Sequence, residues 1–318
     1  MELALYTDCL STLSFEEALD VAAGLEMGVV ELPVGDRAHL PPDRVAELLD
    51  DLAALAELRA QLDTRGLRVH ALNCTAWAYQ ADFGDEFGAV LDSTIRLAEK
   101  LSVDKIVTVS GCPGVPPALK AIEWMTVPYP PDYFEALATQ WDEGVARWRE
   151  LVATANAHGV STIALALHPL ALVSNAPTLS RFRDQVGTTI GASIDPATMF
   201  WQQMDPVKTI ELLGPAVRHV HLGDVEVHDE LLATSGAVLT TTPIEEPRQR
   251  GWTFRTVGLG RGAEFWSGFF DALRSAGHDD AVSLANSDPY IPQDLGATLA
   301  SRFIEGLLTP APTPAAVG

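Results

Sequence analysis

The stretch Ile190–Asp224 decides the fold. It begins Ile-Gly-Ala-Ser-Ile-Asp195 and, after a segment of helical periodicity, ends Val-Arg-His219-Val-His221-Leu-Gly-Asp224. Each of these two runs is short and apolar, as in a buried strand, and closes on a polar side chain. Side chains alternate along a strand, so His219 shares a face with His221. The pattern predicts two successive parallel strands that present Asp195 and His221 at their carboxyl ends.

The same alternation of strand and helix runs through the whole chain. The expected strands are Leu3–Tyr6, Val29–Leu32, Leu67–Leu72, Lys105–Ser110, Ser161–Leu167, Ile190–Ile194, Val217–Leu222 and Ala281–Leu284. The expected helices are Phe15–Met27, Arg44–Arg65, Glu86–Leu101, Tyr133–His158, Leu179–Val186, Pro206–Leu213, Ala263–Ala276 and Leu295–Leu307. Eight such units predict an α/β fold, a (β/α)8 TIM barrel, whose active site lies at the carboxyl ends of the strands.

The barrel is expected to be a single domain over residues 1–308, followed by a disordered tail rich in Pro and Ala over residues 309–318. Two segments are longer than ordinary loops, Gly111–Asp132 and Val225–Thr256. Because both follow expected strands, they should lie over the catalytic face as lids or binding loops.

Composition and charge narrow the class of protein. The chain is 47% apolar and 20% charged, which is typical of a soluble globular protein. Its net charge of −22 disfavours nucleic acid and anionic membranes as partners, and we expect a small-molecule substrate instead. The cysteines Cys9, Cys74 and Cys112 form no disulfide or metal pattern, and the chain begins without a signal peptide. These features predict a cytoplasmic protein.

The predicted catalytic group is His221 with Asp195 and His168. Asp195 should lie on the strand beside His221 at the same height, and His168 follows Ala166 on the inward face of the fifth expected strand. A carboxylate beside a neutral imidazole raises the pKa of the imidazole, which can then act as a general base. We interpret His219, one layer deeper, as a hydrogen-bonded core residue.

Further residues are predicted to contact the substrate. Arg255 and Arg261 flank a Gly-rich turn before a helix, where backbone amides and an Arg can hold an anion. Glu31 ends the second expected strand and could equally form a structural ion pair. Asp224 follows His221 by three residues and could equally cap a helix or hold a turn. Aromatic side chains at strand ends or in the long loops offer faces for a sugar or planar ligand. They are Trp77, Trp124, Tyr129, Trp201 and Trp252.

Six motifs carry a resemblance that covers nearly the whole chain. They are Gly28-Val-Val-Glu31-Leu-Pro, Val109-Ser-Gly-Cys112-Pro-Gly, Ile163-Ala-Leu-Ala166-Leu-His168-Pro, Ile194-Asp195-Pro-Ala-Thr198-Met-Phe-Trp201, His219-Val-His221 and Phe254-Arg255-Thr-Val-Gly-Leu-Gly. The chain resembles the sugar phosphate isomerase/epimerase family, with the xylose isomerase-like TIM barrel that AP endonuclease 2-type domains also have. The resemblance implies a fold and a family but no particular substrate.

The resemblance also implies a metal site that this sequence lacks in part. Family members typically hold one divalent cation with a Glu, an Asp, a His and a Glu from the fifth to the eighth strands. Asp195 and His221 match the middle two positions, but Ala166 and Ala285 stand at the two Glu positions. Because Mn²⁺ and Mg²⁺ prefer several oxygen ligands, we expect no metal cofactor. The alternative is a Mn²⁺ or Mg²⁺ site rebuilt with His168 or Asp288.

Three functional hypotheses remain open. The first is an isomerase, epimerase or lyase that acts on a sugar or related polyhydroxy or keto compound by His221/Asp195 proton transfer without the usual metal. The second is a non-catalytic ligand-binding or scaffold barrel that partners an active relative. The third is a metal-dependent sugar isomerase with rebuilt ligands. A homo-oligomer or a complex with a related barrel subunit is compatible with each hypothesis.

Overall fold

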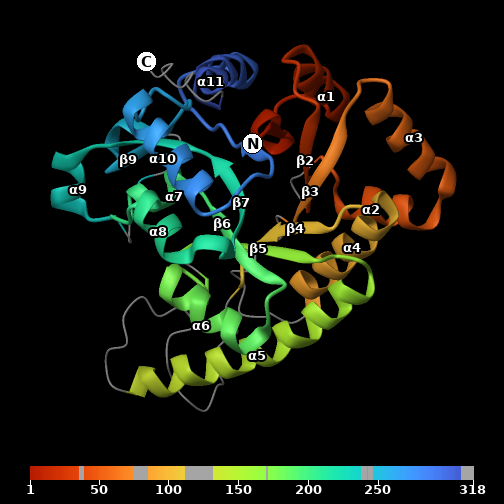
Figure 1. Ribbon diagram of the computed structural model, residues 1–318, viewed down its shortest axis with the longest axis horizontal. Helices are drawn as coiled ribbons and strands as arrows, with labels where there is room; N and C mark the ends of the chain where they lie inside the picture. Colours follow the sequence, from red (N-terminus) through yellow and green to blue (C-terminus); the bar gives the residue numbers. More distant parts are fainter. Residues whose placement is uncertain are drawn as a thin grey trace, which may run out of the picture.

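The computed structural model confirms the predicted (β/α)8 barrel (Figure 1). It describes residues 1–35, 39–74, 85–111, 132–169, 171–237, 242 and 246–308. Eight parallel strands close in the order β1-β10-β7-β6-β5-β4-β3-β2. They are β1 (Leu3–Tyr6), β2 (Val29–Val34), β3 (Arg68–Cys74), β4 (Lys105–Thr108), β5 (Thr162–Ala166), β6 (Ile190–Ile194), β7 (Val217–Leu222) and β10 (Val282–Leu284).

Helices surround the barrel and cover its outer face (Figure 1). The longer helices are α1 (Phe15–Gly24), α2 (Pro42–Asp50), α3 (Leu52–Asp63), α4 (Asp85–Leu101), α5 (Asp132–Ala157), α6 (Ala176–Val186), α8 (Pro206–Leu213), α10 (Ala263–Ser275) and α11 (Gln293–Leu308). Large buried side chains such as Trp148, Phe182 and Trp266 fill the layer between helices and strands. Burial of this apolar layer is the main driving force for the fold.

Local sequence signals fix several helix ends. At α1, the Ser14 hydroxyl accepts the Glu17 amide at 3.3 Å and the Glu17 carboxylate accepts the Ser14 amide at 2.8 Å, which forms a capping box. The single helix predicted over Arg44–Arg65 is in fact α2 and α3. Asp51 separates them, because its backbone is extended and its carboxylate accepts the Ala53 amide at 2.7 Å to begin α3.

The long segment after β7 contains secondary structure that the sequence did not predict. Strand β8 (Asp224–Val227) pairs antiparallel with β9 (Trp252–Arg255), and the short helix α9 (Asp229–Ser235) follows β8. A second short helix, α7 (Pro196–Phe200), follows β6 and contacts β8. A two-stranded sheet therefore stands where we expected a binding loop.

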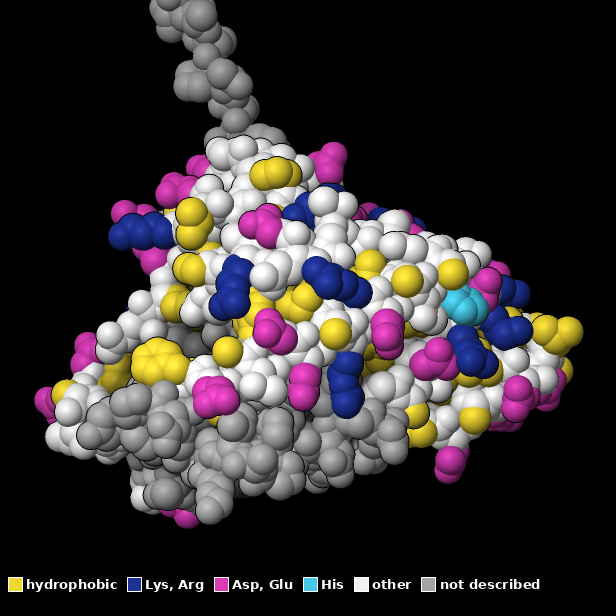
Figure 2. Space-filling model, turned by 90° about the horizontal axis from the view of Figure 1, so that it is seen from below, with side chains coloured by type: hydrophobic (Ala, Val, Ile, Leu, Met, Phe, Trp, Pro, Cys, Tyr) yellow, Lys and Arg dark blue, Asp and Glu magenta, His cyan; other side chains and the backbone are white. Residues whose placement is uncertain are grey.

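Charged side chains of both signs lie on the surface of the protein. On the face drawn in Figure 2, Asp and Glu side chains are interspersed with Lys and Arg side chains. The acidic surplus is not gathered into one patch on that face. Across the described residues, no helix is both long and apolar enough to cross a bilayer. The predicted disordered tail, residues 309–318, lies outside the described residues.

Candidate active site

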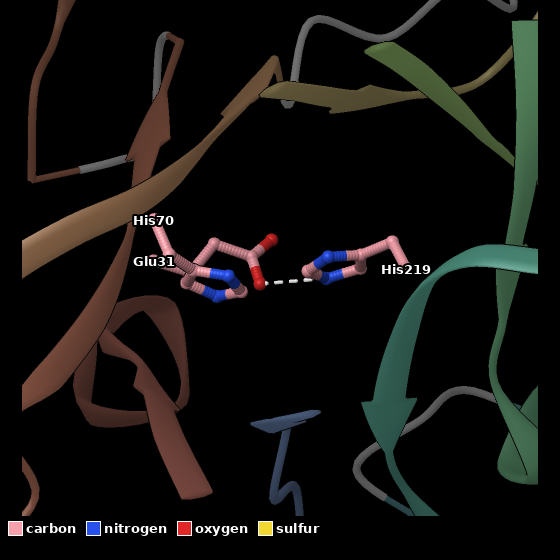
Figure 3. A group of neighbouring side chains, drawn as sticks. All are labelled: Glu31, His70 and His219. Carbon is pink, nitrogen blue, oxygen red and sulfur yellow. Dashed lines mark ion pairs between the residues drawn. The ribbon is translucent and has the colours of Figure 1, made fainter. Parts of the chain in front are cut away.

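Three strands on opposite sides of the barrel direct polar side chains into its interior. Glu31 comes from β2, His70 from β3 and His219 from β7, and they point toward one another (Figure 3). Glu31 and His219 are fully buried, and His70 is 7% exposed. Each side chain offers a potential ligand atom within 4.8 Å of the others. The barrel interior therefore holds a polar cluster in a mainly apolar core.

The Glu31 carboxylate is the centre of this cluster. Its Oε1 accepts a hydrogen bond from Asn73 Nδ2 at 2.7 Å and is bonded to His221 Nε2 at 2.9 Å. Its Oε2 lies 2.9 Å from His219 Nε2, but neither atom has a partner in hydrogen-bond geometry. Burial alone would raise the pKa of Glu31, yet the nearby charges of His221 and His219 outweigh burial and lower that pKa well below its usual value.

His221 differs from the deeper imidazoles in charge and in access. Its side chain is 11% exposed and its ring stacks on Tyr6 with centroids 5.1 Å apart. Burial lowers the pKa of His221, but Glu31, Asp195 and Asp8 raise it by more, so the pKa is raised overall. Desolvation lowers the pKa of His219 to about 4 and that of His70 to about 3.

Asp195 and Glu31 make contacts that the sequence did not specify. The barrel register pairs Ser193 with His219, which keeps Asp195 near the height of His221, as predicted. However, Asp195 Oδ1 accepts the Ala197 amide at 3.0 Å and caps α7, and it acts on His221 through charge. The hydrogen bond of His221 goes to Glu31, for which the sequence left open a substrate contact or a structural ion pair.

The carboxylate of Asp224 holds the Gly-rich turn that lies between Arg255 and Arg261. Asp224 Oδ2 accepts the amides of Gly258, Gly260 and Arg261 at 2.9 to 3.0 Å, and Oδ1 accepts the Val225 amide at 2.8 Å. A Cβ at Gly260 would lie 2.5 Å from the Val225 carbonyl oxygen, so the turn needs glycine there. The amides that we expected to hold an anion are thus directed at the Asp224 carboxylate.

Arg255 and Arg261, the two arginines predicted to contact the substrate, both interact with other side chains of the protein. Arg255 pairs with Glu226 and with Asp288, and its guanidinium lies 5.5 Å from the Tyr290 ring. Burial would lower the pKa of Arg255, but the bonds to Glu226 and Asp288 raise it. Arg261 places its guanidinium 4.3 Å from the Phe200 ring, and its Nε is buried without a hydrogen-bond partner.

The remaining predicted site residues fall into three groups. Trp201 stacks on Trp252 with centroids 5.0 Å apart, and both are at least 92% buried in a small apolar cluster. His168 follows β5, and desolvation lowers its pKa to about 4. Trp77 and Trp124 lie outside the described residues, as does Tyr129.

Comparison with known proteins identifies the family. The sequence profile described as "Xylose isomerase-like TIM barrel" matches residues 19–305. The chain belongs to the xylose isomerase-like TIM barrel family. It is also 33% identical over 300 residues to the uncharacterized protein YfiH of Bacillus subtilis (strain 168), a match that covers 93% of this chain and 96% of YfiH. The resemblance inferred from the six motifs is confirmed.

Solved structures share the family fold at low identity. One is a probable 3-DHS dehydratase, AsbF, from Bacillus anthracis, with a TM-score of 0.66, 15% identity, and coverage of 96% of this chain and 99% of AsbF. Another is a D-psicose 3-epimerase from Clostridium cellulolyticum H10, solved with D-tagatose. Its TM-score is 0.65, its identity 16%, and the coverage is 97% of this chain and 99% of the epimerase. At such identities the likeness shows the fold alone.

The metal ligands that the resemblance implies do not fit this member of the xylose isomerase-like family. Ala166 ends β5, where it pairs with Ser193 in the register, and Ala285 follows β10. Their methyl groups offer no ligand atom, and one oxygen of Asp195 already caps α7. A hard divalent cation would therefore find one free carboxylate oxygen and one imidazole, far fewer ligands than it prefers. Glu31, His70 and His219, by contrast, form a set that can hold a metal ion.

Sequence reasoning did not single out His70, and it interpreted His219 as a core residue, which agrees with the full burial of His219. His70 lies within β3, and His219 lies within β7, two residues before His221. The available signal was a histidine inside each of two mainly apolar strands. That signal alone does not show that the two strands face each other across the barrel, where the rings stack with centroids 5.4 Å apart.

Proposed function

We propose that this protein is a sugar-modifying enzyme of the isomerase, epimerase or lyase kind, in which His221 moves a proton next to a carbonyl group. The observation that carries the proposal is the position of His221. Its ring is hydrogen-bonded to the Glu31 carboxylate at 2.9 Å and is the member of the interior histidine group that reaches the solvent on β7. The substrate class is a sugar or a related polyhydroxy or keto compound.

The side chains around His221 suit it to proton transfer in both directions. Glu31 fixes Nε2, Tyr6 stacks on one face of the ring, and the charge of Asp195 favours the imidazolium. The neutral ring accepts a proton from the carbon beside a carbonyl, and the imidazolium then returns it to carbon or gives it to a departing hydroxyl group. The first outcome is isomerisation or epimerisation, and the second is elimination of water.

Two further observations support this reading. Structural neighbours include an epimerase and a probable dehydratase, and both epimerisation next to a carbonyl and β-elimination begin with the same proton abstraction. Ala166 and Ala285 replace the carboxylates of the usual metal site, so we propose that the reaction runs without the family's divalent metal at Asp195 and His221. General acid–base catalysis of this type contributes about 10² to 10⁴ in rate.

Proton exchange tests the proposal directly. The protein is incubated in D₂O with a panel of ketoses, aldoses and cyclic polyhydroxy ketones, and ¹H NMR follows loss of the proton next to the carbonyl. We expect exchange or turnover with a subset of the panel and a loss of at least about 100-fold in His221→Gln. His158→Gln is the matched control, because His158 also pairs with a carboxylate, Glu99 at 2.8 Å, but on the helical surface.

Two outcomes would contradict the proposal. Unchanged exchange in His221→Gln removes His221 from the chemistry. Substrate binding in the wild-type protein without exchange or turnover favours the alternative of a non-catalytic ligand-binding barrel. A circular dichroism spectrum of each variant confirms that the barrel has folded.

A further inference from the structure

We infer that Glu31, His70 and His219 form a binding site for one divalent transition-metal ion, Zn²⁺ or an ion of similar preference, inside the barrel. The site is deeper than His221 and uses β2, β3 and β7 instead of the strands that carry the usual ligands of the family. The inference does not depend on the proposed reaction, because it concerns binding alone.

The arrangement of the three side chains is the first support. Their ligand atoms all lie within 4.8 Å of one another, and the three side chains converge from opposite walls of the barrel (Figure 3). Glu31 Oε2 and His219 Nε2 approach to 2.9 Å without hydrogen-bond geometry. A metal ion bound by both atoms would lie to one side of the line that joins them and would replace this ion pair.

Unpartnered buried atoms are the second support. His70 Nδ1 and His219 Nδ1 are buried without a hydrogen-bond partner, and Glu31 Oε2 and His219 Nε2 form an ion pair with each other but no hydrogen bond in good geometry. Glu31 and His219 are fully buried, and His70 is 93% buried. Buried polar atoms in native proteins are nearly always satisfied, and a group of unsatisfied atoms at one point indicates a bound ion or water. Here the unsatisfied atoms include a carboxylate oxygen and imidazole nitrogens, which are ligand types for Zn²⁺.

The neighbouring residues hold the ligands as an outer shell would. His70 Nε2 is bonded to Ser283 Oγ at 2.9 Å, so that His70 Nδ1 can present its lone pair to a metal. Asn73 Nδ2 and His221 Nε2 both bond to Glu31 Oε1 and leave Oε2 for the metal. Metal-bound histidines commonly donate their other ring N–H to such a partner, which fixes the tautomer and the ring orientation.

The chemistry of the set selects the kind of ion. Two imidazoles and one carboxylate suit Zn²⁺, Co²⁺ or Fe²⁺, whereas Mg²⁺ and Ca²⁺ prefer sites made of oxygen atoms. Catalytic zinc sites often use three protein ligands of these types and leave a position for water. The charge of Lys105 acts on His70 and His219, but Lys105 is paired with Asp280, which limits its repulsion of a metal.

Metal binding by the chelator-treated protein tests the inference. Isothermal titration with Zn²⁺, elemental analysis after gel filtration, and the absorption spectrum of the Co²⁺-loaded protein are recorded without substrate. We expect one tight Zn²⁺ per chain and Co²⁺ bands of nitrogen and oxygen coordination. His70→Gln and His219→Gln should each weaken binding by at least about 100-fold, and Ser283→Ala by about tenfold.

Control variants separate this site from other histidines. His278→Gln changes another buried histidine, outside the cluster, and should bind Zn²⁺ as the wild-type protein does. Asp195→Asn changes the family ligand position and should also retain the metal. No stoichiometric Zn²⁺ or Co²⁺ in the wild-type protein would overturn the inference, and so would loss in Asp195→Asn with retention in His70→Gln. If one histidine variant fails to fold, the other histidine variant and Ser283→Ala still test the site.

Discussion

Two polar regions lie near the same end of the barrel, and they differ in how completely their polar atoms are paired. In the Gly-rich turn beside β8 and β9, Asp224 accepts four backbone amides and Arg255 pairs with two carboxylates. In the barrel interior, His70 Nδ1 and His219 Nδ1 have no hydrogen-bond partner, and Glu31 Oε2 meets His219 Nε2 only as an ion pair without hydrogen-bond geometry. A saturated polar group holds the chain in place, whereas unsatisfied groups that converge are available to a ligand. The same residue types can therefore serve structure in one place and chemistry in the other.

The largest expected effect on the free energy of unfolding is in the barrel interior, around Glu31. Glu31→Ala should lower the free energy of unfolding by about 3 to 5 kcal/mol, because it removes the carboxylate that neutralises His221 and leaves buried polar groups without a partner. Urea denaturation in the presence of a chelator measures the effect apart from metal binding. Glu47→Ala is the control, since Glu47 pairs with Arg44 on the surface, and it should stay within about 0.5 kcal/mol of the wild-type protein. Equal losses in both variants would refute the central role of Glu31.

A somewhat smaller loss of stability is expected in the Gly-rich turn, where Asp224 is fully hydrogen-bonded. Asp224→Ala leaves four backbone amides without their acceptor and should cost about 2 to 3 kcal/mol in unfolding free energy. Hydrogen exchange should then be faster for the amides of Gly258 and Gly260, while proton exchange on the substrate keeps its dependence on His221. If Asp224→Ala left stability unchanged but abolished substrate binding, Asp224 would belong with the ligand contacts, as the sequence suggested.

The smallest effect concerns an ion pair at the opposite, amino-terminal end of the strands. Lys105 at the start of β4 is buried and pairs with Asp280, which is 45% exposed. Burial raises the pKa of Asp280, but the bond and charge of Lys105 outweigh burial and lower it from 3.8 to about 2. The pair should therefore contribute stability above pH 4 that is lost as the pH falls toward 2.

Because Asp280 is partly exposed, this contribution should be modest, about 1 kcal/mol. Asp280→Asn should lower stability at neutral pH and flatten the decline of stability between pH 4 and pH 2, as followed by thermal melts across that range. A variant whose stability falls with acid as steeply as that of the wild-type protein would show that the pair contributes little.

The sequence predicted the barrel because its signals are local. Each strand is a short apolar run followed by a helical period, and eight repeats of that unit suffice for closure. The sheet of β8 and β9 escaped prediction because its strands are separated by 24 residues and pair only with each other. The break between α2 and α3 depends on one backbone conformation at Asp51, which a helical period does not reveal.

The site was predictable only where it depends on one strand at a time. Alternation along β7 placed His221 on the inward face near the height of Asp195. The partner of His221 could not be inferred in this way, because β2 and β7 are separated by β1 and β10 in the closed barrel. Glu31 meets His221 only through the curvature of the whole ring. The same holds for His70, which faces His219 across the interior.

This cross-barrel arrangement divides the site between the two halves of the chain. Glu31, His70 and Asn73 come from the first four strands, and His219 and His221 come from the last four. Neither half-barrel would carry the cluster on its own, and an open sheet that had not yet joined β1 to β10 would hold its members apart. The cluster is thus a property of ring closure, and its formation would report the last step of assembly more directly than secondary structure does.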